Sequence, residues 1–427
     1  MKDCKCGKVH KEPLTRVILE NGAVDRLKDL LLECKAKKVF IIADKNTERV
    51  AGDKVYAILD EITVAYKRCV FAEEKVVPNE MFVGRAVMSY DQSCDLVLAI
   101  GSGVINDISK IVSKIADKPY YIIATAPSMD GYVSATSSME VDGVKVSLPS
   151  KCADVIIGDI DVLKNAPMQM LQAGLGDMLA KYISVAEWRI ANEILGEYYC
   201  EDIAEQVRVA LRKCIDQADL LLQRDENAVK AVFEGLVLCG KAMAMAECSR
   251  PASGVEHYFS HVWDMRGLEF TLPTNLHGIQ CAVATYIVSG LYEKVLTLTP
   301  DKERALSYVQ AFDYSNWAKQ LKSFLGTSAD AMITLEEKEK KYSVEAHKAR
   351  LQVIIEKWDK ICTIIRQEIP TQKQIEKLLQ TIGLPTTPKE IGIDCDLALT
   401  LKATKDIRDK YVLSRLLWDI GEIETII

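Results

Sequence analysis

Residues 95–107 read DLVLAIGSGVIND, an apolar run followed directly by a glycine-rich turn. The run at 95–100 is short and aliphatic, which is typical of a strand buried in a parallel sheet. After the turn, a periodic segment that contains Lys110 predicts a helix. A strand, a glycine turn and a helix in this order predict a loop for the phosphates of a dinucleotide, because glycines let backbone N–H groups approach and the helix N-terminus adds partial positive charge.

The turn departs from the usual G-x-G-x-x-G fingerprint, because Asn106 stands where the third glycine would be. A tight structural turn is therefore the alternative. Asp44 follows the strand-like run at 38–43, where an acid could accept hydrogen bonds from a cofactor ribose or simply cap a helix. It precedes the glycine loop, which points away from the ordinary Rossmann arrangement, and its charge would repel a 2′-phosphate and so favour NADH over NADPH.

The segments around this loop alternate in the same way. Further apolar runs at 63–71, 120–125 and 154–160 predict strands, residues 23–34 and 79–89 have helical spacing, and 137–148 resembles a β-hairpin around Asp142-Gly143. From about Pro167 the chain changes to long helical patterns at 200–222, 228–246, 276–291 and 336–367. We therefore predict a Rossmann-like α/β domain with a mostly parallel sheet over 1–162 and an all-α domain over 163–427.

The composition is that of a folded globular protein. The 427 residues include 49% hydrophobic and 27% charged residues, with a net charge of −7. Such a charge gives no basic footprint for nucleic acid or anionic lipid. The chain has no apolar run of spanning length, and its N-terminus lacks the apolar stretch of a signal sequence, so we expect a cytoplasmic protein with a small-molecule substrate and no membrane partner.

The 13 cysteines are scattered without regular spacing, which favours reduced thiols over a disulfide framework. Cys4, Cys6 and His10 are the exception to weigh, because they could form part of a zinc site. They lack a clear fourth ligand nearby, so a frayed polar terminus is the favoured interpretation.

Three of the five histidines lie close together in the sequence. His257 and His261 are one helical turn apart and share a face, and His277 begins the next predicted helix. Imidazoles with a carboxylate suit a divalent metal that keeps positions open for substrate. The best carboxylate is Asp177, which we expect at the start of an apolar helix, where a buried acid is costly unless it is paired or bound to metal. The alternative is an N-cap aspartate beside ordinary helix histidines.

Four motifs in this order resemble the superfamily of iron-containing alcohol dehydrogenases, glycerol dehydrogenases and dehydroquinate synthases, and especially the sn-glycerol-1-phosphate dehydrogenase family. The resemblance covers nearly the whole chain. It rests on residues 101–107, the segment TAPSMDGYVS at 125–134, the Gly176-Asp177 pair, and RPASG at 250–254 running into His257.

The resemblance implies a fold of the dehydroquinate synthase type and a reaction between dihydroxyacetone phosphate and sn-glycerol-1-phosphate, with NAD(P)H and one divalent metal, zinc or nickel, per subunit. It implies that the metal ligands are Asp177, His257 and His277. Asp130, Asp177 and His261 would be the catalytic and substrate-binding residues. The cofactor would lie against Asp44, Gly101, Ser102, Gly103, Val104, Ile105, Asp107, Thr125, Ser128 and Ser134.

Alternatives accompany this interpretation for one residue and for the function. Arg250 is a candidate for the substrate phosphate, because guanidinium groups bind phosphate oxygens in pairs, but a structural ion pair is the competing role. A glycerol dehydrogenase acting on an unphosphorylated polyol is the nearest rival function, and a lyase of the dehydroquinate synthase type ranks lower. We expect a homodimer or higher homo-oligomer, since closed symmetry is the commonest arrangement.

Overall fold

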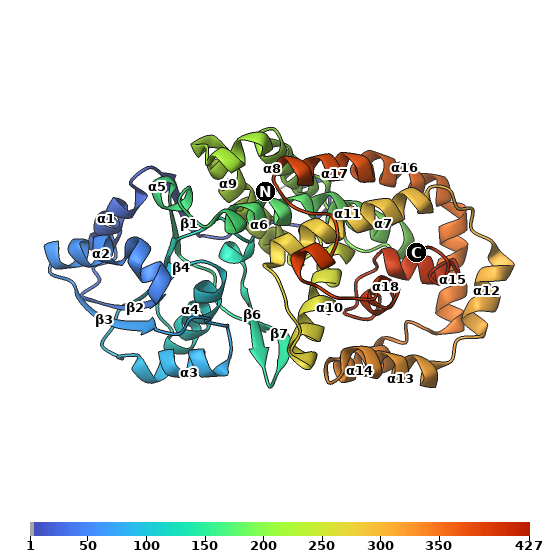
Figure 1. The fold of residues 1–427 in the computed structure, drawn as a ribbon, viewed down its shortest axis with the longest axis horizontal. Helices are drawn as coiled ribbons and strands as arrows, with labels where there is room; N and C mark the ends of the chain where they lie inside the picture. Colours follow the sequence, from blue (N-terminus) through green and yellow to red (C-terminus); the bar gives the residue numbers. More distant parts are fainter. Residues whose placement is uncertain (1–3) are drawn as a thin grey trace. The chain divides into compact units, whose positions relative to one another are not determined.

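The computed structural model describes residues 4–427, and its internal contacts divide them into two compact units. The first comprises residues 9–178 and 209–247, and the second comprises residues 4–8, 179–208 and 248–427. Met1–Asp3 lie outside the described residues. They begin the N-terminal segment in which we expect no signal sequence. Among the described residues, the first unit holds every strand and the second consists of helices and their connections (Figure 1).

The first unit is built on a six-stranded parallel sheet in the order β1-β8-β5-β4-β2-β3. Its strands are β1 (Arg16–Glu20), β2 (Lys38–Asp44), β3 (Ala65–Phe71), β4 (Leu96–Gly101), β5 (Tyr120–Ala124) and β8 (Val155–Asp159). Five of them confirm the predicted runs. Strand β1 was not predicted, because it pairs only with β8 at the sheet edge and both its end residues are exposed charged side chains.

All strands of the sheet are parallel, but the order in which the chain adds them reverses beside β2. From β2 the chain continues to β3 at the edge, then returns to β4 on the other side of β2. Such a reversal leaves a crevice beyond the carboxyl ends of the strands, where α/β proteins bind their ligands. Asp44 ends β2, Gly101 ends β4, and Thr125 follows β5, so the sheet brings three predicted cofactor residues to the same edge.

Helices cover both faces of this sheet. On one face α1 (Arg26–Glu33) and α2 (Lys45–Glu61) pack against alternate residues of β2, β4, β5 and β8, and on the other α4 (Gly103–Ala116) packs with α3 (Glu80–Ser89). The predicted hairpin is confirmed as β6 (Thr136–Val141) and β7 (Val144–Pro149), which project away from the sheet (Figure 1). Asp142 and Gly143 at its turn have φ of 52° and 75°, as a two-residue hairpin loop requires.

The boundary expected after residue 162 falls inside the first unit. After α5 (Ile160–Leu163), helices α6 (Met168–Leu179) and α9 (Glu226–Ala246) pack on the loop that follows β5. The Tyr132 and Phe233 ring centroids are 5.4 Å apart, and a Cβ added at Gly174 would lie 1.8 Å from the Pro127 carbonyl oxygen. These contacts join residues far apart in the sequence, so they could not be deduced from local patterns.

The second unit is helical, as predicted. Its helices include α7 (Lys181–Leu195), α10 (Val255–Phe270), α11 (His277–Val295), α12 (Lys302–Gln310), α13 (Tyr314–Leu325), α17 (Gln372–Thr381), α18 (Leu397–Thr404) and α19 (Leu413–Asp419); α8 (Glu201–Ile215) starts in it. The helical pattern at 336–367 is divided among α14 (Ser328–Glu339), α15 (Val344–Glu356) and α16 (Trp358–Glu368). Lys340, with φ of 50°, ends α14, and Ser343 caps α15. No helix in residues 4–427 is long and apolar enough to cross a membrane.

Candidate active site

The glycine loop joins β4 to α4 at the chain reversal of the sheet. A Cβ at Gly101 would lie 2.5 Å from the Ile105 Cβ, so the close approach of strand and helix requires glycine there. The Ser102 side chain makes no capping hydrogen bond to the described residues of α4. Ser102 therefore does not occupy the first backbone N–H groups of the helix, which are the groups that bind phosphate in loops of this kind.

The side chains beyond the loop hold the local fold. The Asp107 carboxylate accepts hydrogen bonds from Ser138 N at 3.2 Å and from Lys110 Nζ at 3.5 Å, and Lys110 also donates to the Gly131 carbonyl at 2.8 Å. Burial raises the pKa of Asp107 and lowers that of Lys110. Ile105 packs against Gly101. The contact of Ile105 and Asp107 with a cofactor stays a prediction.

Asp44 is a helix cap. Its carboxylate accepts hydrogen bonds from Asn46 N at 2.8 Å and Thr47 N at 3.0 Å, and Thr47 completes a capping box. The capping role weighed for Asp44 is thus confirmed, while its contact with a ribose stays a prediction.

The other predicted cofactor residues follow β5. Thr125 N donates to the Gly101 carbonyl at 3.1 Å, which ties the segment after β5 to the glycine loop. Thr125 and Ser128 are buried, and the hydroxyls of Ser134 and Thr136 lie 2.9 Å apart. These residues sit at the same end of the sheet as the loop, and their contact with a cofactor stays a prediction.

The expectation that Asp177 begins a helix is wrong. Helix α6 starts at Met168, and Asp177 lies near its far end, so the N-cap alternative is also wrong. In the sequence, the glycines at 174 and 176 resemble the end of a helix. Gly174 nevertheless belongs to α6, because it packs on the Pro127 backbone. Asp177 is fully buried and accepts a hydrogen bond from Asp130 N at 3.0 Å, so the two predicted acids meet in the first unit.

In the second unit the three predicted histidines come together. His277 begins α11, and its ring centroid lies 5.0 Å from that of His257 and 5.9 Å from that of His261, both on α10. His257 Nδ1 bonds to Glu256 Oε1 at 2.7 Å. His277 Nδ1 lies 2.9 Å from Ser260 Oγ, which donates its own hydrogen to Gln280, so Nδ1 is the donor. Imidazoles held through Nδ1 present Nε2 as the ligand atom, which is the usual arrangement around a metal.

Two buried carboxylates position the start of α10. Glu187 Oε2 accepts from Val255 N at 2.9 Å, and Glu256 Oε1 accepts from Gly254 N at 2.8 Å. Burial and the nearby Glu256 raise the pKa of Glu187 to about 8. A Cβ at Gly254 would come within 2.7 Å of both carboxylates, which explains the glycine at this position.

Sequence reasoning missed Cys281. Its Sγ lies 3.6 Å from His277 Nε2, and the potential ligand atoms of His257, His277 and Cys281 all lie within 4.8 Å of one another. Burial alone would raise the pKa of the Cys281 thiol, but the two histidines bring it below its usual value. The sequence signal that could have identified Cys281 is its position one helical turn after His277, on the same face of the helix. Two imidazoles beside a thiol form a donor set that suits zinc or nickel.

Arg250 has partners that favour its structural role. It donates to both carboxylate oxygens of Glu197, at 2.9 and 2.6 Å, and to the Tyr411 carbonyl at 2.7 Å. The side chain is buried. A bidentate ion pair of this kind occupies the guanidinium face that a substrate phosphate would need.

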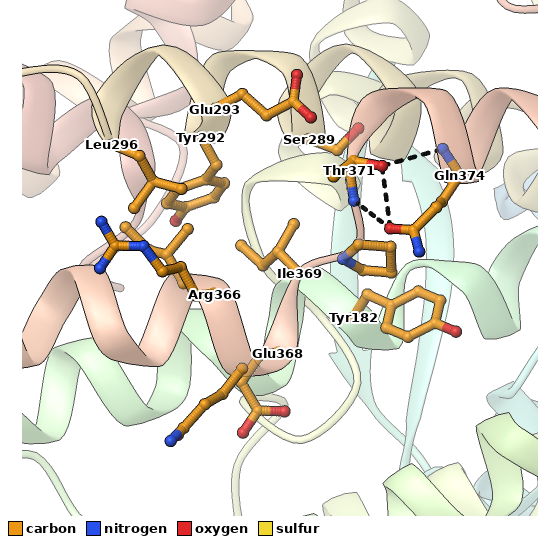
Figure 2. A pocket seen from close by; sticks show the side chains of 13 residues that line it. Tyr182, Ser289, Tyr292, Glu293, Leu296, Arg366, Glu368, Ile369, Thr371 and Gln374 are labelled. Atoms are coloured by element: carbon orange, nitrogen blue, oxygen red, sulfur yellow. Dashed lines mark hydrogen bonds between the residues drawn. The ribbon is translucent and has the colours of Figure 1, made fainter.

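A hollow elsewhere in the second unit contains none of the predicted site residues. It is lined by parts of α7, α11 and the α16–α17 connection (Figure 2). Thr371 and Gln374 bond to each other there as the capping box of α17, and Glu368 is paired with Arg189 and Arg208. Its Ser289 lies twelve residues, or roughly 18 Å of helix, from His277 along α11. This hollow is therefore distinct from the histidine cluster.

Comparison with known proteins identifies the class. Residues 18–167 match the family described as iron-containing alcohol dehydrogenase. The maleylacetate reductase of Agrobacterium tumefaciens has the same fold, with a TM-score of 0.62 at 13% identity and 97% of each chain covered. At this identity the likeness shows the fold alone, a parallel sheet followed by helices.

Curated relatives narrow the class to one family. The glycerol-1-phosphate dehydrogenase [NAD(P)+] of Bacillus licheniformis is 31% identical over 298 residues, which are 69% of this chain and 74% of that protein. The enzyme of the same name from Halalkalibacterium halodurans is 29% identical over 385 residues, 89% of this chain and 86% of that protein. The chain belongs to the glycerol-1-phosphate dehydrogenase family. It is an oxidoreductase for a small-molecule substrate, of a family that uses NAD(P) and a metal.

Proposed function

We propose that the protein interconverts dihydroxyacetone phosphate and sn-glycerol-1-phosphate, with NAD(P)H as the hydride donor in the reducing direction. The observation that carries this proposal is the pair His257 and His277, with ring centroids 5.0 Å apart and each Nδ1 held by a neighbour. The assignment of the substrate rests on the names of the relatives, and the assignment of the cofactor is supported by the glycine loop at the sheet reversal.

The metal ligands we propose are Asp177, His257 and His277, holding one zinc or nickel ion per subunit. Asp177 is a buried acid in an apolar helix, and a cation would offset the cost of its charge. Bound there, a divalent ion would supply Lewis acidity that polarises the substrate ketone.

The chain itself would orient the cofactor. We assign its pyrophosphate to the N–H groups that follow Gly101, its ribose to Asp44, and its remaining surface to Thr125, Ser128 and Ser134. Because the Asp44 carboxylate would repel a 2′-phosphate, we expect NADH to be preferred.

The proton that completes reduction would come from Asp130 or His261, directly or through water. The hydrogen bond from Asp130 N to Asp177 fixes the Asp130 loop, and His261 stacks at 25° on His277. If the double variant Asp130→Asn with His261→Gln keeps full turnover, this assignment is wrong.

The experiment that tests the function compares two ketones. NADH oxidation by the metal-loaded protein is followed with dihydroxyacetone phosphate and with dihydroxyacetone. We expect kcat/KM to be about 100-fold or more higher for the phosphate, because a site built for a charged group discriminates strongly against its absence. Turnover of dihydroxyacetone alone would make the protein a glycerol dehydrogenase.

We also propose that the protein is a homodimer, to be tested by analytical sedimentation.

A further inference from the structure

Three thiols outside the proposed active site converge in the second unit. Cys4 and Cys6 come from the N-terminal segment, and Cys200 from the connection between α7 and α8. The Cys4 and Cys200 Sγ atoms are 3.4 Å apart, and the Sγ atoms of all three lie within 4.8 Å of one another. Cys200 is fully buried.

The local backbone is shaped to bring two of these thiols together. Gly7 N donates to the Cys4 carbonyl at 3.0 Å, which closes a tight turn over Cys4–Gly7. Gly7 has φ of 80°, a conformation that favours glycine. Lys8 Nζ, 3.8 Å from the Tyr198 ring centroid, anchors the end of the turn on the α7–α8 connection.

The spacing of the sulfur atoms suits a metal better than a disulfide. A disulfide would need two sulfurs about 2.05 Å apart and would leave the third thiol over. A tetrahedral zinc ion with Zn–S bonds of about 2.3 Å has its thiolate sulfurs about 3.8 Å apart. The Cys4–Cys200 separation of 3.4 Å is near this edge length, and the other separations are within 4.8 Å.

His10 is the nearest imidazole in the sequence, four residues after Cys6, so at most about 14 Å of chain separates them. Within the first unit, His10 is buried and its Nδ1 lies 3.0 Å from the Met245 carbonyl oxygen. Because a carbonyl can only accept, Nδ1 carries the proton and Nε2 is the lone-pair nitrogen. Metal-binding histidines are commonly oriented by such a bond.

We propose that Cys4, Cys6, Cys200 and His10 bind a structural zinc ion. Four protein ligands fill a tetrahedral shell and leave no open position, so this ion would take no part in the reaction. It would anchor the N-terminal turn to the α7–α8 connection, two segments separated by 196 residues in the sequence. The site shares no residue with the catalytic metal proposed at Asp177, His257 and His277.

The first test uses the unmodified protein and the rate at which each cysteine is alkylated. Peptide mapping would follow N-ethylmaleimide labelling of zinc-loaded protein before and after chelation. We expect Cys4 and Cys6 to react at least about tenfold faster once zinc is removed, because the metal holds the thiolates. Cys34 is exposed and serves as the internal control, reacting quickly in both states. Equal rates for Cys4 and Cys6 before and after chelation would overturn the proposal.

The second test counts cobalt ions that replace zinc. Wild-type protein should bind two equivalents and show strong thiolate-to-cobalt charge transfer. Cys6→Ser should lose one equivalent and most of this absorption, while Cys34→Ser keeps both and His277→Ala loses only the other equivalent. An unchanged cobalt count and absorption in Cys6→Ser, or a Cys4–Cys200 disulfide in protein isolated under reducing conditions, would refute the site. Failure of the proposed reaction would leave these readouts unchanged, so the two proposals are tested separately.

Discussion

Asp177 is the residue on which the proposed chemistry depends most, because its carboxylate is a proposed metal ligand. We predict that Asp177→Asn removes one equivalent of bound metal and lowers NADH oxidation by about 10³-fold or more, because several kcal/mol of ketone activation is lost. Metal content after dialysis and kcat/KM measure this. Asp225→Asn, at the half-buried N-cap of α9, is the matched control, since Asn caps as well as Asp. Full metal content in Asp177→Asn would contradict the ligand assignment.

Asp44 permits a test of cofactor preference that preserves its helix cap. Serine caps a helix about as well as aspartate but carries no charge. We predict that Asp44→Ser lowers KM for NADPH relative to NADH by about tenfold, since a carboxylate near a phosphate costs roughly 1–2 kcal/mol at a partly solvated site. Asp301→Ser, at the N-cap of α12, should leave the ratio unchanged. An unchanged ratio in Asp44→Ser would show that this carboxylate does not face the ribose.

Residues of the candidate site differ in how far the sequence reveals them. The histidine cluster and the glycine loop are visible because their members are close together in the chain. Cys281 was missed although it lies one turn after His277, because a cysteine in an apolar helix resembles ordinary core. Cys200 was missed as a partner of Cys4 because nothing local connects residues so far apart.

At the scale of elements, the contact between α6 and the loop after β5 gives a sharp stability prediction. Gly174→Ala would place a Cβ 1.8 Å from the Pro127 carbonyl oxygen and 2.9 Å from Val232 Cγ1. We expect a loss of about 3 kcal/mol, measured as a lower midpoint of urea unfolding, because the loop backbone must shift. Gly84→Ala in α3 meets no atom within 4 Å among the described residues and should gain up to about 1 kcal/mol. Equal midpoints for the two variants would contradict this packing.

Glu187 makes the start of α10 sensitive to pH. Its pKa in the folded protein is about 8, against an ordinary value of 4.5. Between these values the folded state binds more protons than the unfolded state, so the free energy of unfolding falls as pH rises from about 4.5 to 8. We predict that Glu187→Gln makes this decline shallower, by at most about 1.4 kcal/mol per pH unit. Unfolding at several pH values checks it, and identical slopes would contradict the assignment.

Most elements were predictable from local pattern, and the exceptions have physical reasons. Central strands such as β4 are continuous apolar runs, so their sequences are distinctive. Strand β1 is an edge strand, and the start of α6 was misplaced because Gly174 and Gly176, shortly before Asp177, resemble a helix break. In both cases a tertiary contact, with β8 or with Pro127, overrides the local signal.

For the whole molecule, the order of a parallel sheet followed by helices could be predicted, but the grouping into compact units could not. Residues 209–247 join the sheet-containing unit although they belong to the helical half of the sequence. Apolar helices carry no local signal of which core they will enter. For the same reason, the proposed metal ligands were gathered by resemblance and not by spacing, since Asp177 belongs to one unit and the two histidines to the other.

The configuration of the product tests the central claim most directly. Dihydroxyacetone phosphate would be reduced with NADH by the metal-loaded protein, and the product offered to a dehydrogenase specific for sn-glycerol-3-phosphate. We predict that NADH is consumed and that the product is not oxidised by that enzyme, because hydride reaches the ketone face that yields sn-glycerol-1-phosphate. Complete oxidation of the product would contradict the account.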